Sequence, residues 1–133
     1  MSGCLHHVSL TCRDLGKSQR FYGQFGYTTL KSYTDEQVSI VIMTSESGPA
    51  IELFCFTLLK YDHPSASHID TMPNIQSIGI THIAIQVDDI TATRQQLAKS
   101  SPCTEIKTAR LGGFVYFFTH DPDGNQVEII MEH

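Results

Sequence analysis

Apolar residues alternate with polar ones over several short stretches of this chain, and in two other stretches they follow helical spacing. Val8, Leu10 and Cys12 are apolar and alternate with polar residues, so a strand is predicted over residues 4–12. A helix is predicted between Asp14, the expected N-cap, and Gly26, the expected C′ residue. Three further strands are predicted from β-branched, aromatic and apolar runs, at residues 27–33, 38–43 and 50–56.

The same succession of elements starts again after residues 57–79. That intervening stretch contains two prolines, two histidines and small polar residues, and we interpret it as a linker or lid. A strand is then predicted over 80–87, and a helix capped by Asp88 or Asp89 and running to about Ser100. Strands at residues 104–109, 114–119 and 126–131 complete the pattern, with a turn at 121–124.

The two halves are copies of one pattern. Residues 5–10 (LHHVSL) align with residues 80–85 (ITHIAI), 75 positions later, and residues 51–54 (IELF) align with residues 127–130 (VEII), 76 positions later. Two copies are too few for a solenoid, and the repeat is also longer than a solenoid repeat. The expected fold class is therefore α+β. It consists of one domain over residues 1–133, built from two βαβββ modules at 1–56 and 80–133 with the linker 57–79.

Composition and charge limit the kinds of binding partner and the cellular compartment to be expected for this protein. The 133 residues carry 9 Lys and Arg against 14 Asp and Glu, a net charge of −5, and no basic cluster. Such a chain is a poor candidate for binding nucleic acid or an anionic membrane. No apolar run reaches membrane-spanning length, and the first residues lack the features of a signal peptide, so we expect a cytoplasmic protein. Its four cysteines, without C-x-x-C spacing, are expected to be free structural thiols.

The repeat places one histidine near the start of each half and one glutamate near its end. His7 and His82 occupy equivalent positions, as do Glu52 and Glu128. A single strand histidine is more often structural than a ligand, and a single strand glutamate can simply be solvated. Both glutamates, however, alternate with apolar residues along their strands. They also share a face with further apolar residues: Phe54 and Phe56 with Glu52, and Ile130 with Glu128. A carboxylate on such an apolar surface needs a partner. Two imidazoles and two carboxylates suit a divalent metal, with positions left for water or substrate: Zn²⁺ or Ni²⁺, with Co²⁺, Mn²⁺ and Fe²⁺ as alternatives.

These segments give the chain a resemblance that covers nearly its whole length. With Phe21-Tyr22, Phe118 and residues 121–128 (DPDGNQVE), they make the sequence similar to the vicinal oxygen chelate superfamily, which includes glyoxalase I, extradiol dioxygenases and bleomycin resistance proteins. The resemblance implies paired βαβββ modules forming a curved mixed sheet around a metal-binding cleft. It also implies metal ligands at His7, Glu52, His82 and Glu128, the set most similar to glyoxalase I.

The same resemblance separates the branches of the superfamily. Extradiol dioxygenases typically lack a glutamate at the position of Glu52 and carry a tyrosine where this chain has Phe118. Bleomycin-binding members generally lack the metal ligands. Glyoxalase I typically has an arginine, which helps to hold a glutathione carboxylate, at the position of Thr11; Arg13 is the candidate substitute.

We therefore expect a lactoylglutathione lyase-like metalloenzyme. It would act on a small hemithioacetal or α-hydroxycarbonyl through a metal-stabilised enediolate, with a glutathione adduct as a candidate substrate. Glu128 is the expected base, and Glu52 could play the mirrored part. The alternatives are a non-catalytic drug- or metabolite-binding protein and an Fe²⁺ extradiol-type dioxygenase. A homodimer is expected, with the modules paired within one chain or between two. The expected substrate pocket consists of Thr11, Arg13, Phe54, Phe56, Tyr116 and Ile130.

Overall fold

The computed structural model describes residues 1–60 and 78–133. The chain divides into two compact units, Met1–His63 and Pro64–His133, and each is described by itself. Most of the expected linker 57–79 lies outside the described residues, as do its two histidines, His63 and His68. Within the described ranges, neither helix has the length and apolar character needed to cross a membrane.

The first unit is a four-stranded mixed sheet with one helix. Its elements are β1 (His7–Thr11), α1 (Leu15–Gly23), β2 (Thr28–Thr34), β3 (Val38–Thr44) and β4 (Ala50–Phe56). The strand order is β1-β4-β3-β2, with β1 parallel to β4 and the other pairs antiparallel. The first strand of the module therefore lies directly beside its last strand.

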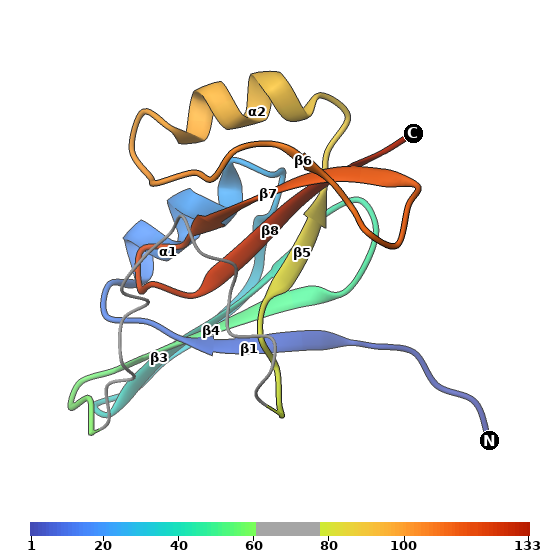
Figure 1. The fold of residues 1–133 in the computed structure, drawn as a ribbon. Coiled ribbons are helices and arrows are strands. Elements are labelled where there is room, and N and C mark those ends of the chain that lie inside the picture. Colours follow the sequence, from blue (N-terminus) through green and yellow to red (C-terminus); the bar gives the residue numbers. More distant parts are fainter. Residues whose placement is uncertain (61–77) are drawn as a thin grey trace. The chain divides into compact units, whose positions relative to one another are not determined.

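The second unit, whose elements are labelled α2 and β5 to β8 in Figure 1, repeats this topology strand for strand. It contains β5 (Ile83–Gln86), α2 (Ile90–Leu97), β6 (Lys107–Thr108), β7 (Phe114–His120) and β8 (Gln126–Glu132). The order is β5-β8-β7-β6, again with one parallel pair, β5 with β8. Two βαβββ modules of α+β class are thus confirmed.

The core of each unit lies between its helix and one face of its sheet. Asp14 and Asp89 cap the two helices, accepting hydrogen bonds from the N–H groups of Lys17 (3.0 Å) and Ala92 (2.9 Å). On the strand that lies beside the first strand of each module, alternate residues are buried: Ile51 and Leu53 on β4, Val127 and Ile129 on β8. Alternation therefore turns the residues between them, which include both glutamates, to the other face of each sheet.

Some element boundaries differ from those predicted. The first strand begins at His7 rather than at residue 4, and the helix α1 ends at Gly23, although Gly26 does have the left-handed φ of +87°. The strand predicted over 104–109 shrinks to Lys107–Thr108. Ahead of it, Thr104 is held to β7 by both its backbone N–H and its hydroxyl, which bond to Phe118. There the bond from the Phe118 N–H to the Thr104 hydroxyl takes the place of a backbone bond of the regular ladder that the prediction assumed.

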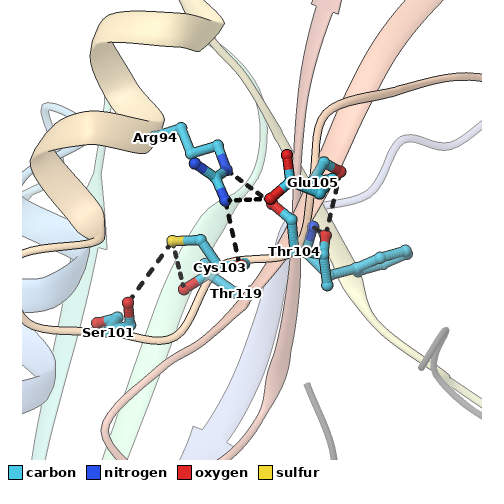
Figure 2. Close-up of polar contacts among 7 residues, drawn as sticks. Arg94, Ser101, Cys103, Thr104, Glu105 and Thr119 are labelled. Carbon is cyan, nitrogen blue, oxygen red and sulfur yellow. Dashed lines mark hydrogen bonds and ion pairs between the residues drawn. The ribbon is translucent and has the colours of Figure 1, made fainter. Parts of the chain in front are cut away.

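Arg94 attaches α2 to this irregular segment, as Figure 2 shows. Its guanidinium donates to the carbonyl oxygens of Thr104 (2.7 Å) and Cys103 (3.5 Å) and lies 3.3 Å from a carboxylate oxygen of Glu105. The Cys103 thiol contacts the Ser101 carbonyl and the Thr119 hydroxyl. Burial raises the pKa of this thiol. All four cysteines are free, as predicted.

Candidate metal centre

In the first unit, β1 and β4 bring His7 and Glu52 together. The parallel register sets Ser9 opposite Glu52, so His7, two residues before Ser9, lies on the same face. Nε2 of His7 is 3.5 Å from Oε1 of Glu52. The side chains are 37% and 25% exposed, so the pair is open on one side to an incoming ion or ligand.

The second unit contains the same pair at the corresponding place. The register sets Ala84 opposite Glu128, and His82 lies two residues before Ala84. Nε2 of His82 is 3.1 Å from Oε2 of Glu128, and the side chains are 25% and 14% exposed. Each module therefore presents one imidazole nitrogen and one carboxylate side by side on the face away from its helix.

The other ring nitrogen of each histidine is held by the preceding residue. Nδ1 of His82 is 2.8 Å from the Thr81 hydroxyl, and Nδ1 of His7 is 2.8 Å from Nδ1 of His6. A partner on Nδ1 fixes the ring orientation and selects its tautomer. In both modules this arrangement directs Nε2 toward the glutamate.

These pairs have the chemistry of a divalent metal site. When Nδ1 carries the ring proton, the Nε2 lone pair faces a carboxylate oxygen, and two acceptors so close together need a cation or a proton between them. Nitrogen and oxygen donors of this kind suit Zn²⁺ and its borderline neighbours. In the described parts of each unit, the candidate ligands form pairs and no cluster of three or more. The nitrogen and oxygen donors of each pair are thus of the kinds that a divalent metal ion accepts.

Aromatic side chains flank both pairs. The His82 ring meets Phe118 edge to face at 5.3 Å, and Phe118 meets Tyr116 at 5.7 Å. Tyr116 lies opposite Ile130, so two of the predicted pocket residues are neighbours on β7 and β8. In the first unit, Phe54 and Phe56 stack at 5.9 Å, two and four residues beyond Glu52 on β4. An apolar wall therefore extends from each pair along its sheet.

The remaining predicted pocket residues lie near the end of β1. Thr11 is exposed and lies opposite Phe54, which places it on the face of His7 and Glu52. Arg13 comes after the last residue of β1, so strand alternation no longer assigns its side chain to that face.

Sequence reasoning missed the residues that hold the pairs. Ser9 donates its hydroxyl to Oε1 of Glu52 at 2.5 Å, and Thr81 holds His82. Ser9 shares the two-residue period of His7, which was a visible signal, but its contact with Glu52 depends on the register of two strands more than 40 residues apart. His6 precedes β1, and its ring contacts that of His7 edge to face.

Comparisons with known proteins agree with this architecture. The chain is 30% identical to the Bacillus subtilis protein YwkD over 94% of each chain. It is 29% identical to a lactoylglutathione lyase of Haemophilus influenzae, covering 93% of this chain and 89% of that one. The trypanothione-dependent glyoxalase I of Leishmania major superposes with a TM-score of 0.67 at 24% identity, covering 98% of this chain and 88% of that one.

The chain also matches a protein family as a whole. Residues 4–129, which include both His–Glu pairs, match the sequence profile of the Glyoxalase/Bleomycin resistance protein/Dioxygenase superfamily. That range begins before β1 and ends within β8, so it spans both modules. The chain belongs to this superfamily.

Proposed function

We propose that this protein is a metal-dependent isomerase or lyase of the glyoxalase I type, acting on a small hemithioacetal or α-hydroxycarbonyl compound. The observation that carries the proposal is the repetition of one His–Glu pair at corresponding positions of two equal sheets. Two pairs supply the four ligands of one ion: His7, Glu52, His82 and Glu128. The relationship to the lactoylglutathione lyase of H. influenzae supports the same reaction class.

The divalent ion, when bound, supplies the Lewis acidity that makes a C–H next to a carbonyl acidic enough to lose its proton. Zn²⁺ and Ni²⁺ are the first candidates for such a set of nitrogen and oxygen ligands. The protein contributes the ring orientation: Thr81 and His6 hold the Nδ1 sides, so both Nε2 atoms stay available.

Glu128 is the general base in this proposal. Its carboxylate takes the proton from the substrate carbon and returns it to the neighbouring carbon, and Glu52 is the mirrored candidate. The Glu128 side chain is 14% exposed and lies opposite buried Phe118, so little water competes for its oxygens. A base that is shielded in this way can pass the same proton between two carbons without losing it to solvent.

Aromatic and aliphatic side chains bind the carbon part of the substrate. These are Phe54 and Phe56 beside one pair, and Tyr116 and Ile130 beside the other. If the substrate is a glutathione adduct, Thr11 and Arg13 are the candidates for its carboxylate, in place of the arginine that glyoxalase I has at the position of Thr11. A cytoplasmic homodimer is part of this proposal.

The test is a turnover assay of protein reconstituted with Ni²⁺ or Zn²⁺. Methylglyoxal is offered with and without glutathione, and product formation is followed by absorbance. Product that requires both metal and glutathione supports the glyoxalase reaction. Consumption of O₂ with catechols would instead assign an extradiol-type oxygenase. Tight binding of an aromatic ligand with neither turnover nor metal would assign a sequestering protein, a function that the aromatic walls would also serve.

A further inference from the structure

The two glutamates of the repeat differ in what flanks them. On β4, Glu52 has Ser9 of β1 on one side and Ile42 of β3 on the other. On β8, Glu128 has Ala84 of β5 and Phe118 of β7 in the corresponding places. A hydroxyl beside one glutamate is thus replaced by a methyl group beside the other.

This difference changes the polar contacts of the two carboxylates. Oε1 of Glu52 accepts the Ser9 hydroxyl at 2.5 Å and also lies 3.5 Å from Nε2 of His7. In the described part of the chain, the polar contact of Glu128 is with His82 alone. A carboxylate that accepts a bond from a neighbouring strand loses rotamer freedom, whereas one beside a methyl group and a ring has no second partner to fix it.

We propose that Ser9 is a positioning residue that makes Glu52 the fixed metal ligand of the site and leaves Glu128 as the single base. This inference rests on the proposed function. The hydroxyl holds Oε1 in place, so Glu52 would serve as a constant ligand of a bound ion, while Glu128 would be free to take the proton from the substrate carbon and return it. One residue pair, Ser9 and Ala84, thereby gives a repeated site two different carboxylates.

Metal affinity tests the first half of the inference without any turnover. Apparent dissociation constants for Ni²⁺ or Zn²⁺ are measured by competition with a chromogenic chelator. Ser9→Ala is expected to weaken binding about tenfold or more, the effect typical of losing a contact that orients a ligand. Ser9→Thr, which keeps the hydroxyl, is expected to restore wild-type affinity.

The mirrored substitution tests the second half. Ala84→Ser places a hydroxyl opposite Glu128, and it is expected to lower kcat with little change in KM and no loss of metal affinity. The matched control is Ser39→Ala, which removes the hydroxyl of a half-buried strand residue bonded to Thr34 (3.2 Å), opposite Cys55 and on the other face of the sheet. In the control, kcat and the dissociation constant for metal are expected to stay at wild-type values. Circular dichroism verifies that each variant folds.

The outcomes separate this inference from the proposed function. If Ser9→Ala binds metal as tightly as the wild type, or if Ser9→Ala and Ala84→Ser change affinity and kcat alike, the inference is wrong while the metalloenzyme stands. If the wild-type protein binds no metal and turns over no substrate, the proposed function is wrong, and the inference about Ser9 is wrong as well.

Discussion

The buried carboxylate of Asp121 holds the turn that leads into β8, the strand that carries Glu128. The residue is 5% exposed. Oδ1 accepts the backbone N–H groups of Asp123 and Asn125, both at 2.9 Å, and Oδ2 accepts the Asn125 side-chain amide at 2.8 Å. The turn closes with Gly124 at a φ of +84°, in the left-handed region.

Removing this carboxylate is expected to destabilise the second unit strongly. A hydrogen bond to a charged acceptor contributes about 1.5–3 kcal/mol. Asp121→Ala removes at least these three bonds, but the donors belong to half-buried residues that water can partly satisfy. We therefore expect a loss of about 3–5 kcal/mol in the free energy of unfolding. Asp121→Asn keeps an acceptor for both backbone groups and loses the amide bond, so about 1–2 kcal/mol is expected.

Urea unfolding followed by circular dichroism measures both changes. Asp88→Ala, an exposed aspartate in the same unit that does not cap the helix, is the control and is expected to stay within about 0.5 kcal/mol of the wild type. If Asp121→Ala costs no more than Asp88→Ala, the turn does not depend on the carboxylate. If Asp121→Asn costs as much as Asp121→Ala, the two backbone bonds are not what stabilises it.

Three further results are expected. Glu128→Gln should retain part of the bound metal and lower kcat about 10²–10⁴-fold, the usual contribution of a general base, and full activity in steady-state assays would contradict that role. Burial, partly opposed by the charge of Asp121, lowers the pKa of His120 below 6.5. The folded chain then binds fewer protons than the unfolded one, so the free energy of unfolding should fall as the pH drops below about 6.5. Urea unfolding at two pH values should show a smaller fall for His120→Gln. Burial also raises the pKa of Cys103, so iodoacetamide should modify exposed Cys4 well before Cys103, as mass spectrometry of peptides would show.

The sequence was sufficient to predict the order of elements because the relevant information is local. Asp14 and Asp89 directly precede helical spacing, and both cap the helices as expected. The alternation of each glutamate with apolar residues is equally local, because a period of two fixes the face of every residue in a strand, and the neighbours Ile51, Leu53, Val127 and Ile129 are indeed buried.

Contacts between strands could not be read from the sequence in the same way. The bond between Ser9 and Glu52 depends on β1 lying parallel to β4 in one register, and that choice is made by the packing of the whole module. The length of β6 likewise depends on contacts between distant residues, because bonds between Thr104 and Phe118 take the place of the regular ladder ahead of it. Pairs of histidine and glutamate were predicted from the repeat, whereas the residues that orient them were found only in the folded chain.

The most direct test of the central claim is the metal content of the purified protein. After dialysis and reconstitution with Ni²⁺ or Zn²⁺, elemental analysis of the wild type and of Glu52→Ala gives the stoichiometry. About one tightly held ion per chain is expected in the wild type, and its loss in Glu52→Ala would show that this glutamate is one of the ligands. A wild-type protein that retains no metal would contradict the metalloenzyme and favour a protein that binds its ligand without turnover.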